Sequence, residues 1–313
     1  MIKSQSVKIS IVIVSYNVCE FVLKGIDSVY TYLKYPVQII LVDNKSVDAT
    51  VEEVKKKFPD VEVIVNTDNK GFSAANNQAF HLCTGDIIMM LNPDAAFIDE
   101  SVNLMIEELI KHDGKNILIG PRIVNPDLSF QTSCWKFPSP LQHVLELFFL
   151  NTMIDTTSYY FQDKKEVMQV DFLSGACMAF NKQTLIKLVG LDVNLFWMDD
   201  ADVCKRNSEL GGTNYFFPLS TISHYLGQSS KKNQRVVISN QIISKLKYYK
   251  KHKQFSFFIV SLPIFIFQIL TRMPLFFLIG IIKPIYLKKA VAYLYTFKRL
   301  MAYLIINKQT VVS

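Results

Sequence analysis

The stretch ISIVIVSYN at residues 9–17 decides the fold, because a β-branched apolar run passes directly into three polar residues. An apolar run without alternation is typical of a strand that is covered on both faces of a sheet. The same succession returns in VQIILVDN at residues 37–44 and in IIMMLNPD at residues 87–94. We therefore expect parallel strands whose polar turns meet at one edge of a sheet, where such sheets bind their ligands.

The segments between these runs have the apolar spacing of helices, and later apolar runs predict more strands. This alternation predicts an α/β fold with a mostly parallel central sheet and helices on both faces. We expect helices at Cys19–Leu33, Thr50–Phe58 and Ser73–Leu82, and a helix that starts within Trp197–Arg206. Further strands are expected at Val61–Val65, Val167–Leu173, Cys177–Phe180 and Asn214–Phe217, the last followed by a loop with His224.

Charge divides the chain into an acidic body and a basic tail. The whole chain has 34 Lys and Arg against 27 Asp and Glu, a net charge of +7. Residues 231–313 contain 15 of the basic residues and no acid, which leaves 19 basic and 27 acidic residues before them. We therefore expect a catalytic domain at residues 1–230 and a basic, apolar helical region at residues 231–313.

Cysteine usage and the amino-terminal sequence bear on the compartment. The five cysteines form no C-x-x-C pair, which argues against a zinc site or a disulfide framework. Free thiols suit a reducing compartment. The apolar run at residues 9–14 is too short for the core of an export signal. We therefore expect the catalytic domain in the cytoplasm.

Two carboxylates follow buried strands at positions suited to a nucleotide. Asp43 can accept the ring N–H of a pyrimidine base, and a turn formed with Asn44 is the alternative. Asp94 can bind a divalent cation that bridges a diphosphate, and the alternatives are a plain turn or the N-cap of the next helix. No G-x-G-x-x-G or Walker-type loop follows the first strand, which argues against a dinucleotide-dependent oxidoreductase. A metal would then have to neutralise the phosphates.

The densest acidic cluster consists of Asp199, Asp200 and Asp202, directly after an apolar segment. Crowding of this kind raises the pKa of at least one carboxyl group and makes it a better general base for a sugar hydroxyl. The alternative is that these acids stabilise a helix N-terminus. His224 lies in a polar stretch, where a lone histidine is more often structural than functional.

Seven short motifs, taken in order, resemble the inverting family-2 glycosyltransferases with a GT-A fold, particularly a rhamnosyltransferase-like bacterial branch. They are Ile13–Asn17, Val42–Asp48, Asn69–Gln78, Leu91–Asp94, Phe172–Ala176, Asp199–Arg206 and His224–Ser229. The resemblance implies a nucleotide-sugar site formed by Ser15, Tyr16, Asn17, Asp43, Asn44, Asn69, Gly71 and Phe72.

The same resemblance assigns the chemistry. Asp94, in Asn-Pro-Asp where the family usually has Asp-x-Asp, and His224 would hold Mg²⁺ or Mn²⁺. Asp200 would deprotonate the acceptor hydroxyl for an in-line, inverting displacement. The family's Glu-Asp pair is Asp199-Asp200 here, which leaves open which of the two carboxylates is the base. The next residue, usually branched, is Ala201, which bears on the acceptor pocket.

The tail carries the signals of a membrane-associating region. Phe255–Ile282 is long enough to span a bilayer, but prolines and Arg272 interrupt it, which favours a broken, interfacial or re-entrant pair of helices. In Tyr286–Ile306, Lys288 and Arg299 are expected on a face opposite Val291 and Leu294. Basic amphipathic helices bind anionic membrane surfaces. The alternative is a helical domain packed on the enzyme, and no recognition motif supports nucleic acid.

Together these features predict a glycosyltransferase that uses a nucleoside-diphosphate sugar, dTDP-rhamnose or a UDP-sugar. Its acceptor would be a glycan, carried on a polyprenyl lipid, at the cytoplasmic face of the inner (plasma) membrane. A catalytically silent membrane scaffold of the same fold is one alternative. A sugar nucleotidyltransferase is another, although it would normally show a glycine-rich and basic phosphate loop. Oligomeric state stays open, with a homodimer among the alternatives.

Overall fold

The residues described by the computed structural model are 7–150, 165–225 and 234–309. They belong to an α/β unit, which comprises Met1–Phe137, Ser158–Val193 and Asp199–Ser229, and a helical unit, which comprises Pro138–Thr157, Asn194–Met198 and Ser230–Ser313. The predicted boundary after residue 230 lies outside the described residues and stays a prediction. The helical unit also takes in two segments from earlier in the chain.

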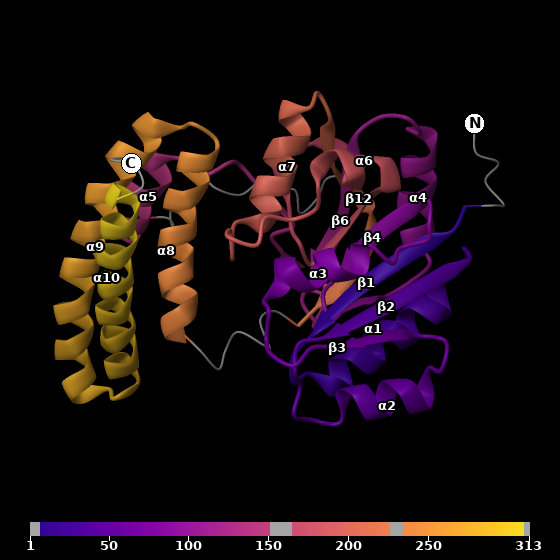
Figure 1. Ribbon diagram of the computed structural model, residues 1–313, viewed down its shortest axis with the longest axis horizontal. Helices are drawn as coiled ribbons and strands as arrows, with labels where there is room; N and C mark the ends of the chain where they lie inside the picture. The colour runs from indigo at the N-terminus through magenta and orange to yellow at the C-terminus, as the bar shows by residue number, and fades with distance from the viewer. Residues whose placement is uncertain (1–6, 151–164, 226–233, 310–313) are drawn as a thin grey trace. The chain divides into compact units, whose positions relative to one another are not determined.

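The first four strands of the α/β unit lie side by side and run in parallel (Figure 1). All seven residues of the first strand are buried, as expected for a strand covered on both faces. Ser15 pairs with Asp43, so the polar residues that end these two strands lie at one edge. The strands are β1 (Ile9–Ser15), β2 (Val37–Asp43), β3 (Glu62–Val65) and β4 (Ile87–Leu91).

The main sheet continues beyond β4 in the order β3-β2-β1-β4-β11-β6-β12-β5. β6 and β12 run in the direction of the first four strands, and β11 and β5 run against them. The later strands are β5 (Ala95–Phe97), β6 (Ile117–Val124), β7 (Phe130–Gln131), β9 (Met168–Gln169), β11 (Cys177–Asn181) and β12 (Thr213–His224). A separate two-stranded sheet pairs β8 (Cys134–Trp135) with β10 (Phe172–Leu173).

Helices cover both faces of the main sheet, and each face has its own core (Figure 1). One core takes buried residues from α1 (Cys19–Tyr32), α2 (Thr50–Lys57) and α4 (Val102–Lys111). The other takes them from α3 (Phe72–Phe80), α6 (Lys182–Leu188) and α7 (Asp199–Glu209). Alternate residues of β1 supply the two cores, which confirms the predicted α/β plan with helices on both faces.

Most predicted elements of the α/β unit are confirmed, and three differ. The predicted strand Val167–Leu173 is two short strands, because β9 pairs with β12 while β10 pairs with β8. The predicted strand Asn214–Phe217 continues past a register shift near Pro218, so His224 is the last residue of β12 and does not lie in a loop. The helix expected from Trp197 begins at Asp199, because Trp197 has a φ of 85°.

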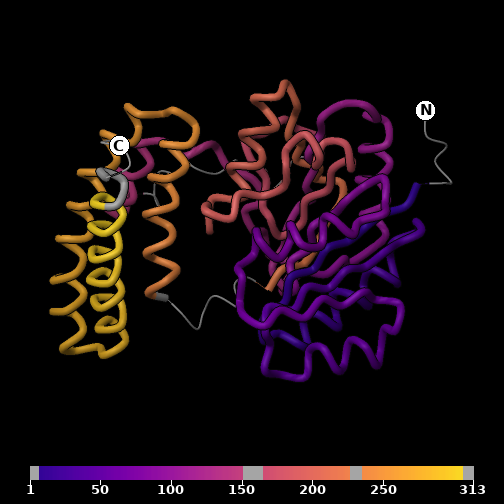
Figure 2. The backbone as a smooth tube through the Cα atoms, viewed as in Figure 1, coloured from indigo at the N-terminus to yellow at the C-terminus, as the bar shows by residue number. Residues whose placement is uncertain are grey.

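The helical unit is built from α5 (Pro140–Leu147), α8 (Gln234–Lys251), α9 (Phe255–Ile282) and α10 (Ile285–Gln309). Figure 2 traces α10 running back alongside α9, and both of these helices pack against α8. Their core is apolar and contains Ile242, Leu246, Phe265, Ile269 and Leu300.

The prediction of a broken pair of helices at residues 255–282 is wrong, because α9 is one helix of 28 residues. It holds Pro263 and Pro274 inside, where packing on α8 and α10 outweighs the loss of two helical hydrogen bonds. Arg272 is partnered within the unit: its guanidinium donates to the Tyr293 hydroxyl at 3.1 Å and to the Glu146 carbonyl. Among the described residues, α9 is the one helix with the length and hydropathy to cross a bilayer.

The predicted faces of the last helix are also wrong. Val291 and Leu294 of α10 are exposed, at 57% and 43%, and Lys288 is exposed with them. Arg299 is instead half-buried and donates to Ser239 and Asn240 of α8, at 3.1 and 2.7 Å. The covered face of α10 instead holds Tyr293, Phe297, Leu300 and Leu304, which recur at helical spacing.

Candidate active site

Asp43 organises the turns that follow β1 and β2. Its side chain is 1% exposed. Oδ1 accepts hydrogen bonds from the hydroxyls of Ser15 at 2.8 Å and Ser46 at 2.5 Å, and Oδ2 accepts one from the Ser46 N–H at 2.8 Å. A carboxylate has about four acceptor positions, so the structure leaves one on Oδ2 for the predicted hydrogen bond to a base.

The residues around Asp43 form an interlocked pair of turns. Asn17 has a φ of 56°, and its side-chain oxygen accepts from the Val47 N–H at 2.7 Å. Its own N–H donates to the Ser46 hydroxyl at 2.9 Å. Tyr16 lies at the surface with 38% exposure. The Tyr16 ring is therefore accessible beside a hydrogen-bonded polar turn, and its role in binding a nucleoside stays a prediction.

A second set of predicted residues lies where the chain enters α3. Gly71 has a φ of 84°, a conformation that favours glycine, and it directly precedes Phe72, the first residue of the helix. The Asn69 side chain accepts from the Gly71 N–H at 3.0 Å, and the Asn44 side chain donates to the Gly71 carbonyl at 3.3 Å. Asn44 therefore joins the end of β2 to the start of α3.

Asp94 and His224 come from distant parts of the chain and meet in the structure. Asp94 follows β4, His224 ends β12, and Asp94 Oδ1 lies 3.2 Å from His224 Nε2. Gln131 Oε1 lies 2.7 Å from His224 Nδ1 and can only accept, so the ring proton is placed on Nδ1. Nε2 faces Asp94 and also lies 3.4 Å from Asn92 Nδ2, and a histidine whose other ring nitrogen is held by a polar partner is typical of metal ligands.

The donor set fits a divalent cation that is only partly held by protein. An aspartate oxygen and a neutral imidazole nitrogen are both ligands that Mn²⁺ accepts, and Mg²⁺ prefers oxygen. Within residues 7–150, 165–225 and 234–309, no group of three or more His, Cys, Asp or Glu side chains could enclose a metal. The remaining positions around such a cation would be left to phosphate oxygens and water.

Asp199 and Asp200 form an acidic pair at the N-terminus of α7. Burial, opposed by hydrogen bonds, raises the pKa of Asp199 to about 6. Burial together with the neighbouring Asp199 raises the pKa of Asp200 to about 7. The third acid, Asp202, is fully buried and accepts from Arg206 Nε at 2.8 Å, and its charge adds to the rise in the pKa of Asp199. Two carboxyl groups that can exchange protons near neutral pH therefore remain.

A chain of contacts brings these clusters to one edge of the sheet. The Ser73 hydroxyl donates to Asp199 Oδ2 at 3.0 Å, which joins the start of α3 to the acidic pair. Gly175 lies beside Asp200, and a Cβ added at Gly175 would be in ordinary van der Waals contact with the Asp200 Cβ, at 3.7 Å. The adjacent Ala176 carbonyl accepts from the Asn92 N–H at 2.8 Å, two residues before Asp94. These contacts link the predicted nucleotide, metal and acidic residues along one edge of the sheet.

A family model whose description is Glycosyl transferase family 2 matches residues 10–189, more than half of the chain. The chain belongs to glycosyl transferase family 2. The matched region holds every predicted nucleotide-sugar residue and Asp94, while the acidic pair and His224 follow it.

Relatives within family 2 point to the predicted branch. An N-acetylglucosaminyl-diphospho-decaprenol L-rhamnosyltransferase of Mycobacterium tuberculosis is 24% identical over 241 residues, 71% of this chain and 78% of that protein. A dolichol-phosphate mannosyltransferase of Pyrococcus furiosus is 33% identical over 123 residues, 37% of this chain and 34% of that protein. The predicted rhamnosyltransferase-like resemblance is confirmed.

Solved structures confirm the GT-A fold. A mannosyltransferase from Pyrobaculum calidifontis in complex with GDP-Man and Mn²⁺ matches with a TM-score of 0.55 at 15% identity, over 95% of this chain and 86% of that one. GalNAc-T7 with UDP, GalNAc and Mn²⁺ matches with a TM-score of 0.55 at 18% identity. The match to GalNAc-T7 covers 80% of this chain and 55% of the GalNAc-T7 chain, so this chain spans about half the length of GalNAc-T7.

Three residues of this family-2 site lay outside the sequence-based prediction. Ser73 holds Asp199, Gln131 orients His224, and Ser46 completes the shell of Asp43. Ser73 and Ser46 stand inside the quoted motifs, so the motifs signalled their neighbourhood although not their contacts. Gln131 lies in a stretch without periodicity, and no pattern could have found it.

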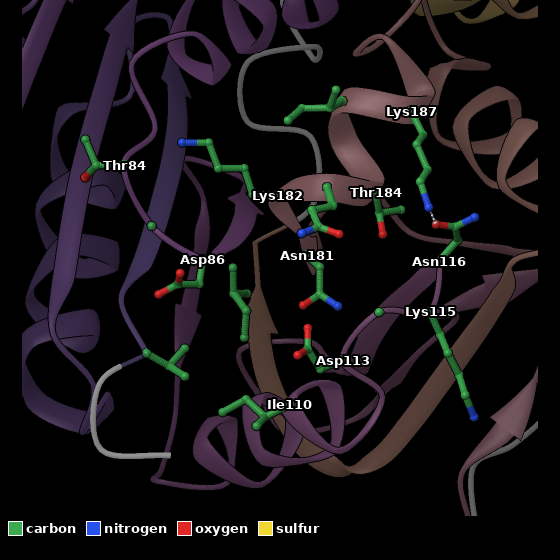
Figure 3. Close-up of a pocket in the computed structure, with 16 residues that line it drawn as sticks. Thr84, Asp86, Ile110, Asp113, Lys115, Asn116, Asn181, Lys182, Thr184 and Lys187 are labelled. Atoms are coloured by element: carbon green, nitrogen blue, oxygen red, sulfur yellow. Dashed lines mark hydrogen bonds between the residues drawn. The ribbon is translucent and has the colours of Figure 1, made fainter. Parts of the chain in front are cut away.

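One pocket lies away from this site (Figure 3). It has a volume of about 270 Å³ and is lined by the residues that precede β4 and β6, at the amino ends of these strands. Asp86, Asp113, Lys182 and Lys187 are among its lining residues, and Lys187 donates to Asn116 at 2.9 Å. It includes none of the predicted site residues.

Proposed function

We propose that this chain transfers a sugar from a nucleoside-diphosphate sugar to a hydroxyl group of a polyprenyl-linked glycan, with inversion at the anomeric carbon. The observation that carries the proposal is the acidic pair Asp199-Asp200, with raised pKa values, joined by contacts to the edge that holds Asp94 and His224. The Mycobacterium tuberculosis relative, whose name includes a decaprenol-linked sugar, supports the acceptor class. dTDP-rhamnose and UDP-sugars are the proposed donors.

The proposed roles follow from position. The turns around Ser15, Tyr16, Asn17 and Asp43 hold the nucleoside, and the entry to α3 at Asn69, Gly71 and Phe72 borders the sugar phosphate. The mixed donor set of Asp94 and His224 holds Mn²⁺ or Mg²⁺. A divalent cation supplies charge for the leaving diphosphate when it is bound.

In the proposed reaction, the acceptor hydroxyl oxygen forms a bond to the anomeric carbon from the side opposite the diphosphate. The bond from that carbon to the diphosphate oxygen breaks and carries its electron pair away. The hydroxyl proton passes to the carboxylate of Asp200, which must be ionised to receive it. The Ser73 hydroxyl holds the carboxyl group of Asp199 in place beside Asp200.

The acceptor proposal is tested by following a radiolabelled sugar from dTDP-rhamnose or UDP-sugars into lipid-extractable product. Purified protein, Mn²⁺ and bacterial membranes are incubated, and the lipids are extracted and treated with mild acid, which cleaves polyprenyl-diphosphate links. We expect label in the lipid phase that mild acid releases. Transfer only into water-soluble or protein-bound glycan would contradict a polyprenyl-linked acceptor.

His224→Gln is expected to raise the Mn²⁺ concentration needed for half-maximal binding by about a hundredfold or more, because loss of a partner that only orients a ligand already costs about tenfold to a hundredfold. Binding of Mn²⁺ is measured by titration in the presence of nucleoside diphosphate. The signal of free Mn²⁺ in electron paramagnetic resonance gives the bound fraction, and no turnover is needed. Gln131→Met keeps the imidazole but removes the acceptor for Nδ1–H, and a smaller shift is expected. Identical Mn²⁺ binding by wild type and His224→Gln would rule out the metal role.

We also propose that the helical unit attaches the enzyme to the cytoplasmic face of the plasma membrane. Large apolar side chains of α9 are exposed among the described residues, including Ile259, Phe267, Leu278 and Ile281, at 54–69%. Residues 231–313 supply 15 basic residues and no acid, which suits an anionic leaflet. Exposed apolar area on this scale marks an interaction surface.

Leu278→Asp together with Ile281→Asp is expected to lower binding to anionic vesicles by about a hundredfold or more, since each exposed apolar side chain that enters the bilayer contributes about 1.5–3 kcal/mol. Flotation of the protein with vesicles of phosphatidylglycerol measures it. Ile186→Asp, a change at a 67% exposed residue of α6, serves as the matched control and should float like wild type. Equal loss in both variants would count against attachment through α9.

A further inference from the structure

The segment that leads into the acidic pair belongs to the helical unit. Asn194–Met198, here called the aromatic turn, is part of that unit, whereas the α/β unit resumes at Asp199. Leu195 and Met198 are buried, and the Met198 N–H closes the turn on the Leu195 carbonyl at 3.1 Å. Between them Phe196 and Trp197 remain exposed, at 39% and 41%. The backbone of the two acids therefore starts from a turn that the helical unit holds.

One face of α8 binds two carbonyl groups of the aromatic turn. The Ser244 hydroxyl donates to the Phe196 carbonyl at 2.5 Å, and the Lys247 ammonium donates to the Asn194 carbonyl at 3.2 Å. Ser244 and Lys247 are three residues apart on a helix and so share a face. Ser244 is 4% exposed, and a buried hydrogen bond of this kind is stronger than one in water.

The turn needs such support because its backbone is strained. Trp197 has a φ of 85°, and a bulky residue in that region costs about 1–3 kcal/mol unless its surroundings enforce it. On the far side of the turn, Asp199 is held by Ser73 and Asp200 accepts from the Ala201 N–H at 2.7 Å. Release of the turn would let the two carboxylates move with it.

We infer that Ser244 is a positioning residue for catalysis. Its hydroxyl fixes the Phe196 carbonyl and, through the strained Trp197, the backbone that carries Asp199 and Asp200. Displacement of a reacting group by about 1 Å can cost about a hundredfold in rate. This inference rests on the proposed catalytic role of the acidic pair.

The kinetic test compares Ser244→Ala with Ser244→Thr, which restores a hydroxyl. For Ser244→Ala we expect kcat to fall by about tenfold to a hundredfold with the donor KM within about twofold, because the donor residues lie on other elements. The acidic limb of the kcat–pH profile should move to lower pH, because Asp200 becomes better hydrated. Ser244→Thr should recover most of the loss. Ser239→Ala removes another fully buried hydroxyl of α8, which binds Arg299, and should leave the profile unchanged.

A spectroscopic test does not depend on turnover. The chain has two tryptophans, Trp135 and Trp197, so Trp135→Phe leaves Trp197 as the only reporter. In that background, Ser244→Ala should raise acrylamide quenching of Trp197 and lower its anisotropy, and Ser239→Ala should change neither. Unchanged quenching with an unchanged pH profile would overturn the inference. Absence of turnover in wild type would instead count against the proposed function, while the quenching result still decides whether Ser244 holds the turn.

Discussion

Asp200→Asn is expected to lower kcat for sugar transfer by about a hundredfold to ten-thousandfold, the range of a lost general base. The amide keeps the shape and the hydrogen bond from the Ala201 N–H, so the fold and donor affinity should persist. Asp199→Asn should have a smaller effect, because Asp199 already accepts a hydrogen bond from Ser73 at 3.0 Å. Initial rates at saturating donor and acceptor measure both variants. More than a tenth of wild-type kcat in Asp200→Asn, or a larger loss in Asp199→Asn, would contradict this assignment.

The pH dependence follows from the same carboxyl group. Burial raises the pKa of Asp200 to about 7, and a base must be ionised to accept a proton. Activity should therefore rise as pH increases through about 7 and fall as pH drops below it, as the protonated fraction grows. The residual activity of Asp200→Asn should lose this limb of the profile. An acidic limb that is the same in both proteins would place the titrating group elsewhere.

Glu146→Ala is expected to destabilise the helical unit by about 1–3 kcal/mol, between the values for exposed and for buried ion pairs, because Glu146 and Lys245 are partly buried. Both Glu146 oxygens accept from Lys245, at 2.9 and 3.0 Å, and His143 lies beside them, fully buried. Burial opposes ionisation of Glu146, but His143 and Lys245 outweigh it and lower its pKa to about 2. The variant leaves the Lys245 ammonium without its carboxylate.

The sign of the pH dependence provides a second readout for Glu146. Its folded pKa lies below the usual 4.5, so its contribution is present above pH 4.5 and is lost as pH falls toward 2. Urea unfolding in detergent at pH 7 and pH 3 should show a difference between wild type and Glu146→Ala that shrinks at the lower pH. Glu108→Ala, in α4, removes an acid that pairs with the exposed Lys111 and also lies 3.3 Å from His112, and should change stability by less than about 1 kcal/mol. Equal stability of wild type and Glu146→Ala at pH 7 would show that the pair contributes nothing.

The sequence predicts the first half of the α/β unit well because local signals there agree with each other. The runs at residues 9–14 and 87–91 are wholly buried and the run at residues 37–42 is buried from Ile39 onward, and a polar turn follows each strand. Asp94 and His224 could be named as a pair only through the family resemblance. Their distance of 3.2 Å depends on the pairing of β12 with β5, which no local pattern encodes.

Sequence reasoning fails where tertiary packing overrides local preference. Prolines and Arg272 argue for a broken α9, yet Arg272 finds partners in Tyr293 and Glu146 that lie 21 and 126 residues away in the chain. The same limit hides Ser244, since a serine in a helix rich in basic residues has no signature of a contact with residue 196. Long-range hydrogen bonds to backbone carbonyls leave no pattern in either partner's sequence.

The most direct test of the central claim is release of nucleoside diphosphate from a panel of dTDP-, UDP- and GDP-sugars. Purified protein is incubated with Mn²⁺ or Mg²⁺ and with membrane extract as the acceptor, alongside Asp200→Asn and an EDTA-treated sample. We predict release from one donor, dependent on the acceptor, that is lost with EDTA and in Asp200→Asn. No release from any donor, together with no binding of any sugar nucleotide, would contradict glycosyl transfer and leave a membrane scaffold of the same fold.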